Sequence, residues 1–166
     1  MGVAADSDAE SASASQELHM RTALDMARRG MAAGGPPVGA CIVRDGRLVS
    51  RNHNAVVGEL DITAHAEIVA IRDACRELRS LNLEGCVLYV TVEPCPMCLA
   101  ACHYAGIDRV VFGAPIAAMH AITGNELLLD TDALFGNAPV RPQLHGGVLA
   151  DECGLLLAQW GKGVRR

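Results

Sequence analysis

Residues 86–98 read CVLYVTVEPCPMC, and this segment joins a buried strand directly to the start of a helix. Residues 86–92 are apolar or β-branched without alternation, which is typical of a strand that is covered on both faces. Pro94 marks the entry to a helix that we expect to run to about residue 105, because Gly106 ends it. A buried strand followed at once by a helix predicts a layered fold that contains both kinds of element.

The segments on either side extend this alternation of strands and helices. Asp45-Gly46 forms a tight-turn pair between an apolar run at 38–43 and a second run from residue 48, which predicts a hairpin. Apolar residues recur at helical spacing within 64–78. Further elements are expected as a first helix from residue 16, a strand at 109–112, a last strand at 144–149 and a closing helix at 150–160. This order predicts an α/β domain with a partly parallel sheet.

The chain has 166 residues, enough for one domain with a sizeable core but too few for two ordinary ones. Hydrophobic residues make up 51% and charged residues 20%, which is a globular balance. The formal net charge of −5 does not favour a general nucleic-acid binder, and no apolar run is long enough to span a membrane. We expect an acidic disordered tail at 1–15, a folded domain at 16–161 and a basic end at 162–166. Because the N-terminus lacks the pattern of a secretory signal, we expect a cytoplasmic protein.

Seven cysteines, an odd number, do not form the pattern of a disulfide framework in a chain this rich in aliphatic residues. Most of them are expected to be small buried hydrophobic side chains. Cys95 and Cys98 differ because they lie three residues apart at the start of a helix, where both sulfurs can face one point. The helix dipole favours the thiolate form there, so this pair is a candidate for metal binding.

His65 opens another helix after a loop, and its imidazole together with the two thiolates makes a three-ligand zinc set. We expect one zinc ion per chain, with its fourth tetrahedral position open to an activated water, as in a catalytic site. Glu67 lies roughly 200° around a regular helix from His65, so it is not expected to bind the same ion. It is placed instead to take a proton from that water and to deliver it to a leaving group.

Each half of this pattern, taken alone, is also compatible with sites of a different kind. A Cys-x-x-Cys pair fits a redox site or half of a structural zinc site, and a lone histidine is usually a core or surface residue. The combination is more restrictive, because His-x-Glu opens one helix and Pro-Cys-x-x-Cys opens another, with a strand between them. This pairing is the described signature of zinc-dependent nucleobase deaminases. It therefore predicts a zinc hydrolytic site in which Glu67 moves the proton.

Residues 16–161 resemble the cytidine deaminase-like superfamily and combine motifs of two of its branches. Those similar to bacterial tRNA adenosine deaminase are TAHAE at 63–67, VEPC at 92–95, RVVFGA at 109–114 and LADEC at 149–153. The motif EPCPMCL at 93–99 is more similar to bacterial guanine deaminase. The resemblance implies a three-layer α/β/α fold with a five-stranded mixed sheet, a zinc site at two helix N-termini and a homodimer. It also implies hydrolysis at a ring carbon that bears an amino group, with release of ammonia.

The same resemblance indicates which residues contact the base. Asn54 lies where both branches carry a base-contacting asparagine, although an asparagine after a strand also serves as a turn residue. The backbone around Ala66 is expected to contribute a hydrogen bond. Glu126 falls at the offset from Cys98 where guanine deaminases place an acidic residue, and a carboxylate accepts both an exocyclic amine and a ring N–H. The alternative for Glu126 is a solvated loop residue. His120 is expected in the same pocket, or otherwise on the surface.

The composition of the later segments bears on the substrate. Residues 115–139 contain no Lys or Arg and lack the Lys-Thr-Gly loop of the tRNA enzymes. Lys162, Arg165 and Arg166 are too few to indicate RNA binding by themselves. We therefore expect a free nucleobase or nucleoside, such as the purine guanine, as the substrate. A tRNA-specific adenosine deaminase is the alternative. A third hypothesis is an inactive module that zinc stabilises. The presence of Glu67 speaks against it, because a structural zinc site needs no proton carrier.

Overall fold

A mixed sheet of five strands forms the centre of the protein, whose computed structural model describes residues 3–138 and 141–164. The sheet order is β2-β1-β3-β4-β5. Antiparallel pairing joins β1 to both β2 and β3, whereas β3, β4 and β5 run parallel. The strands are β1 (Gly39–Arg44), β2 (Arg47–His53), β3 (Cys86–Val92), β4 (Arg109–Ala114) and β5 (Gln143–His145). The predicted five-stranded mixed sheet is confirmed.

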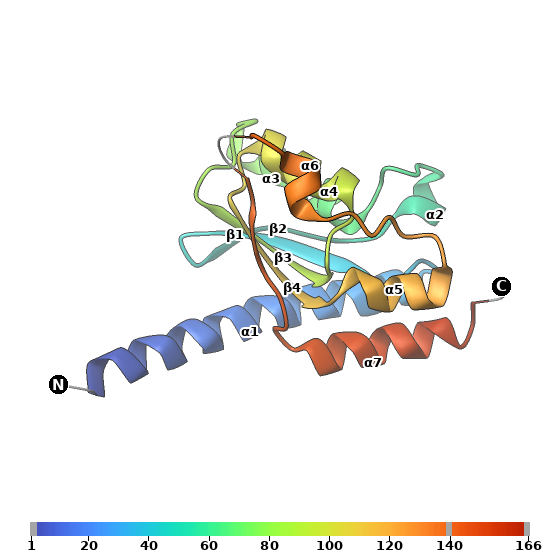
Figure 1. Ribbon diagram of the computed structural model, residues 1–166, viewed down its shortest axis with the longest axis horizontal. Helices are drawn as coiled ribbons and strands as arrows, with labels where there is room; N and C mark the ends of the chain where they lie inside the picture. The colour runs from blue at the N-terminus through green and yellow to red at the C-terminus, as the bar shows by residue number, and fades with distance from the viewer. Residues whose placement is uncertain (1–2, 139–140, 165–166) are drawn as a thin grey trace.

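Helices cover both faces of this sheet, as Figure 1 shows. One face carries α1 (Val3–Ala32), α5 (Ile116–Thr123) and α7 (Ala150–Gly161). The other face carries α3 (Ala66–Leu78) and α4 (Pro96–Ala105). Two short helices complete the chain, α2 (Val56–Glu59) in the loop after β2 and α6 (Thr131–Phe135) next to α4. These three layers are the α/β/α arrangement expected from the sequence.

The central strand β3 explains why the functional residues gather at one edge of the sheet. Six of its seven residues are buried, as its uninterrupted apolar composition predicts. The chain leaves this strand at Val92, which pairs with the last residue of the parallel strand β4, Ala114. Carboxyl ends of parallel strands are where open α/β sheets place their ligand sites. The loops that follow β3 and β4 therefore meet at the same edge.

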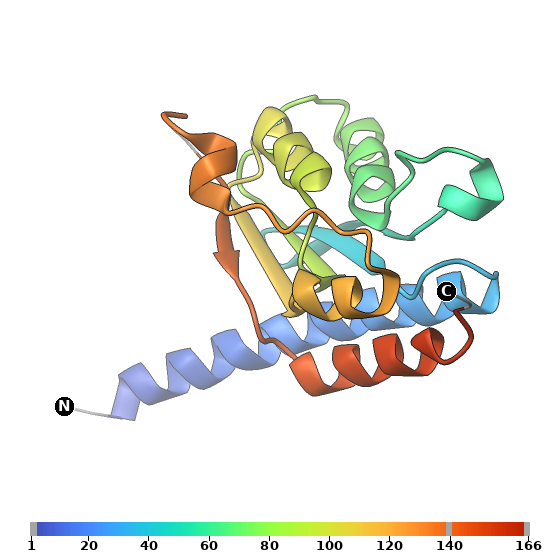
Figure 2. The ribbon, with the colours of Figure 1, turned by 45° about the vertical axis from the view of Figure 1, so that its right-hand side comes forward.

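Two expected segments differ in the structure. Residues 3–15, expected as a disordered tail, form the N-terminal part of α1. They are rich in alanine with acidic residues near the helix start, which favours a helix without apolar periodicity. This part of α1 extends beyond the sheet in Figure 2, and residues 11–15 are exposed. The last strand ends at His145 instead of residue 149, because the backbone turns at Gly147 with a φ of +94°.

The predicted tail and the predicted basic end each lie only partly within the described residues. Met1 and Gly2 of the tail, and Arg165 and Arg166 of the basic end, lie outside the described residues. Within the described part of the chain, no helix combines the length and the apolarity that crossing a bilayer requires.

Candidate functional site

Two helix N-termini meet at the carboxyl edge of β3 and β4. His65 is the N-cap of α3 and Cys95 is the N-cap of α4, and both have extended backbone angles. Pro96 follows Cys95 at the start of α4, where its missing N–H costs no hydrogen bond. The two N-cap side chains face each other, and Cys95 Sγ also bonds to Cys98 in the first turn of α4. The positive ends of two helix dipoles are thereby aimed at one point.

Three ligand atoms surround that point at nearly equal spacing. His65 Nδ1 lies 3.7 Å from Cys95 Sγ and 3.6 Å from Cys98 Sγ, and the two sulfurs are 3.7 Å apart. Tetrahedral zinc with Zn–S bonds of about 2.3 Å and a Zn–N bond of about 2.0 Å requires an S–S edge of about 3.8 Å and N–S edges of about 3.5 Å. These three residues are the candidate metal-binding group within the described chain. The predicted zinc ligands therefore form a site of the size that zinc needs.

The pKa values of His65, Cys95 and Cys98 show that the three groups share protons, which a bound cation would replace. The hydrogen bond with Cys98 lowers the pKa of the Cys95 thiol to about 4. The same hydrogen bond, together with burial, raises the pKa of Cys98. The hydrogen bond with Cys95 raises the pKa of His65. A divalent cation at the centre would displace the protons that these groups share and would hold both sulfurs as thiolates.

Glu67 lies at the second position of α3, beside the three ligands but not among them. Its side chain is 3% exposed, and burial raises its pKa to about 7. Among the side-chain oxygens and nitrogens of the described residues that are completely shielded from solvent, only Glu67 Oε2 lacks a hydrogen-bond partner. Such a group needs a partner, and a water on a metal ion would supply one. A carboxyl group with a pKa near neutrality can both accept and donate a proton.

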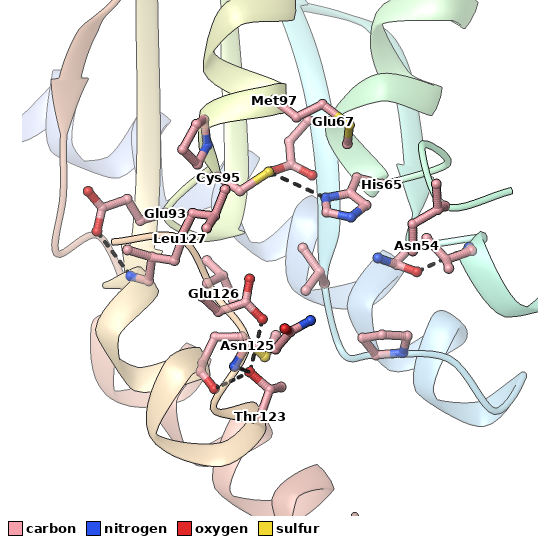
Figure 3. Close-up of a pocket in the computed structure, with 18 of the residues that line it drawn as sticks. Asn54, His65, Glu67, Glu93, Cys95, Met97, Thr123, Asn125, Glu126 and Leu127 are labelled. Atoms are coloured by element: carbon pink, nitrogen blue, oxygen red, sulfur yellow. Dashed lines mark hydrogen bonds between the residues drawn. The ribbon is translucent and has the colours of Figure 1, made fainter. Parts of the chain in front are cut away.

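A cavity of about 380 Å³ is lined by two of the three ligands, His65 and Cys95, and by Glu67 (Figure 3). This volume lies within the usual range for small-molecule sites. The lining is mostly apolar with a few polar groups, which is typical of a pocket that orients a flat ring. The cavity is lined by residues from the helices on both faces of the sheet and from the loops between them. These residues are Pro36, Val38, Asn54, Val56, Ile62, His65, Glu67, Val92, Glu93, Cys95, Pro96, Met97, Ile116, Met119, Thr123, Asn125, Glu126, Leu127 and Trp160.

Two of the predicted substrate residues line this cavity. Asn54 is buried and its Oδ1 accepts a hydrogen bond from the Val56 N–H at 3.2 Å. Its Nδ2 group makes no hydrogen bond within the described residues, and it remains available as a donor. Glu126 approaches from the opposite side in Figure 3, and its Oε1 accepts a hydrogen bond from the Thr123 hydroxyl at 3.0 Å. The cavity thus offers a donor on one side and an acceptor on the other.

The other two predicted substrate residues do not line the cavity. Ala66 is fully buried at the start of α3. The partly buried His120 ring is instead bonded to the backbone of Glu126, with Nδ1 3.0 Å from the Glu126 carbonyl oxygen. Among the lining residues that the sequence did not single out are Glu93, Thr123 and Trp160. The Thr-x-x-Glu spacing of 123–126 could have drawn attention to Thr123, but nothing in the sequence connects Trp160 with Cys95.

Comparisons with known proteins match most of this chain. Residues 13–114 match the cytidine and deoxycytidylate deaminase zinc-binding region. The tRNA-specific adenosine deaminase of Bacillus subtilis (strain 168) is 35% identical over 150 residues, which are 90% of this chain and 91% of that enzyme. The guanine deaminase of the same strain is 43% identical over 99 residues, which are 59% of this chain and 64% of that enzyme. A solved structure of guanine deaminase from Nitrosomonas europaea has a TM-score of 0.79 at 27% identity, covering 88% of this chain and 84% of that one.

Proposed function

The chain belongs to the cytidine and deoxycytidylate deaminase zinc-binding family, and from this membership we propose that it deaminates adenosine in a tRNA. The sequence favoured a free purine base and kept the tRNA substrate as the alternative. We now rank the tRNA substrate first because of the share of the chain that each sequence match covers. The match to a tRNA-specific adenosine deaminase covers 90% of the chain, whereas the match to a guanine deaminase by sequence covers 59%.

His65, Cys95 and Cys98 would hold the zinc ion. Zinc bound by such a set lowers the pKa of a coordinated water to about 7 and supplies the nucleophile. Glu67 would accept one proton from a water at this site and pass it to the ring nitrogen. It would then accept the second proton, from the new hydroxyl on the ring carbon, and pass it to the departing amine. A C–O bond forms at the ring carbon, the C–N bond breaks, and ammonia leaves. The Asn54 amide orients the base by donating a hydrogen bond from Nδ2.

The rim of the cavity suits a base that belongs to a polynucleotide. Trp160, at the end of α7, lines the cavity and is partly exposed. Indole faces support stacking of nucleic-acid bases without sequence preference. Met97, at the start of α4, also lines the cavity and is an exposed apolar side chain. A base extruded from a loop can enter the cavity while its neighbour stacks outside.

Guanine is the second candidate substrate, and Glu126 favours it. The carboxylate lines the cavity and can accept the two adjacent N–H donors that guanine presents and adenine lacks. The guanine deaminase of Nitrosomonas europaea also has a closely similar fold over 88% of the chain. Residues 115–139 carry no basic side chain that would contact a phosphate backbone.

Ammonia release by the zinc-loaded protein on guanine, cytosine and an adenosine anticodon stem-loop separates these candidates. We expect deamination of the stem-loop, with inosine detected by mass spectrometry, and no reaction with Glu67→Gln. If the protein deaminated guanine and did not deaminate the stem-loop, guanine would be the substrate. In that case Glu126→Gln should lower efficiency on guanine roughly 30- to 1000-fold and leave zinc content unchanged.

A further inference from the structure

The helix α5 connects the metal-binding loop with the opposite wall of the cavity. At its start, the Ile116 N–H donates a hydrogen bond to Glu93 Oε2 at 3.0 Å. Glu93 lies two residues before the zinc ligand Cys95, so the beginning of α5 is tied to the loop that carries this ligand. The eight residues of α5 then lead to the turn that presents Glu126.

At the other end of α5, two side chains one turn apart hold Glu126. The His120 ring bonds through Nδ1 to the Glu126 carbonyl oxygen at 3.0 Å, which fixes the backbone. The Thr123 hydroxyl donates to Glu126 Oε1 at 3.0 Å, which fixes the side chain. Gly124 ends the helix with a φ of +68° and lets the chain return over its own last turn.

The remaining contacts of Thr123 fix the direction of its hydroxyl. Thr123 Oγ1 accepts a hydrogen bond from the Asn125 N–H at 3.2 Å. Its single proton has two acceptors within reach, Met119 O at 3.3 Å and Glu126 Oε1 at 3.0 Å. The carboxylate is both closer and charged, and hydrogen bonds to charged acceptors are the stronger ones. The Thr123 hydroxyl therefore donates its proton to Glu126 Oε1 and not to the Met119 carbonyl oxygen.

We propose that Thr123 is a positioning residue whose hydroxyl aims the Glu126 carboxylate into the cavity, where the carboxylate can accept hydrogen bonds from N–H groups of a bound base. Glu126 is only partly buried, so without this hydrogen bond its side chain can rotate toward solvent. The inference rests on the proposed function only in that the cavity holds a nucleobase. It does not depend on which base is deaminated.

The test compares Thr123→Val, which has the same shape without the hydroxyl, with Thr123→Ser, which keeps the hydroxyl. The probe is 8-azaguanine, a base with the two N–H donors, and its Kd is measured by calorimetry on zinc-loaded protein. We expect Thr123→Val to raise this Kd roughly 10-fold and Thr123→Ser to change it less than about twofold. For any substrate that is turned over through Glu126, Thr123→Val should raise KM and leave kcat unchanged.

Glu126→Ala separates positioning from a general structural effect. This variant should weaken 8-azaguanine binding at least as much as Thr123→Val, and adding Thr123→Val to it should cause no further change. The inference would be overturned if Thr123→Val or Glu126→Ala bound 8-azaguanine with the same Kd as wild type. It would also be overturned if wild type did not bind 8-azaguanine. A crystal structure of Thr123→Val with Glu126 unmoved would likewise overturn it. Absence of ammonia release from every base and stem-loop would instead overturn the proposed function, without affecting these binding measurements.

Discussion

Cys95 Sγ lies 3.7 Å from His65 Nδ1, although thirty positions separate the two residues along the chain. Each residue caps its own helix, and the two helices pack against the same face of the sheet. A metal ion held between them would therefore join two helix ends that belong to separate parts of the chain. This arrangement links metal binding to the stability of the fold.

Cys98→Ala should release the metal and destabilise the protein. The variant removes one of three protein ligands, so we expect less than about 0.1 zinc per chain and a Tm lower by more than about 8 °C. Metal analysis and thermal unfolding measure the two effects. Cys102→Ala, one turn further along α4 and equally buried, is the matched control and should keep its zinc. Full zinc occupancy in Cys98→Ala would disprove the ligand assignment.

Glu67→Gln should keep zinc and fold but lose turnover by about 1000-fold, because an amide cannot carry the proton between water and leaving group. The shape of the side chain is preserved, so its buried position is not left empty. Steady-state rates on the best substrate and metal analysis check this together. Near-normal turnover with one bound zinc would mean that another group moves the proton.

Asn54→Asp tests whether the Asn54 Nδ2 group serves as a hydrogen-bond donor to the bound base. Aspartate keeps an oxygen for the Val56 N–H but replaces the Nδ2 donor by a second acceptor. We expect roughly a 10- to 100-fold loss of kcat/KM with an unchanged Tm. Asn54→Ala removes both roles and should additionally lower the Tm. If Asn54→Asp retains full activity, Asn54 serves only as a turn residue.

We expect the protein to be a homodimer in solution. The exposed side of α4 carries Met97 and Tyr104, and the Tyr104 side chain is 86% exposed. Exposed aromatic and methionine side chains are enriched at protein interfaces. Light scattering at micromolar concentration should report twice the chain mass, and Tyr104→Glu should lower the dimer fraction. A monomeric wild type under these conditions would refute the prediction.

Deletion of residues 1–15 should leave the folded domain intact. The described side chains in this segment, at 11–15, are exposed, whereas packing against the sheet begins near His19 and Met20. The Tm should therefore change by less than about 2 °C. Deletion through residue 24 removes the buried Met20 and Leu24 and should abolish folding. A large loss of stability from the shorter deletion would place the domain boundary closer to the N-terminus.

The local signals in the sequence were sufficient for the central strand and for the metal-binding group, whereas the number of strands came from the family resemblance. The apolar run at 86–92 predicted the central strand, and Gly106 marked the end of α4 correctly. His65, Cys95 and Cys98 were recognisable because each lies at a helix start, where sequence position almost fixes direction. The helical state of residues 3–15 was not predicted, because intrinsic helix propensity leaves no apolar pattern.

The tertiary structure alone decided how the cavity is lined and held. Trp160, Glu93 and Thr123 reach it because α5 and α7 pack on the sheet beside the loop that follows β3. It also bonded His120 to the Glu126 backbone and left its ring outside the lining of the cavity. A helix start or a buried strand is specified by its neighbours in the chain, and the sequence can therefore determine it. The orientation of the Glu126 carboxylate depends on side-chain contacts and on helix packing, which only the folded chain brings together.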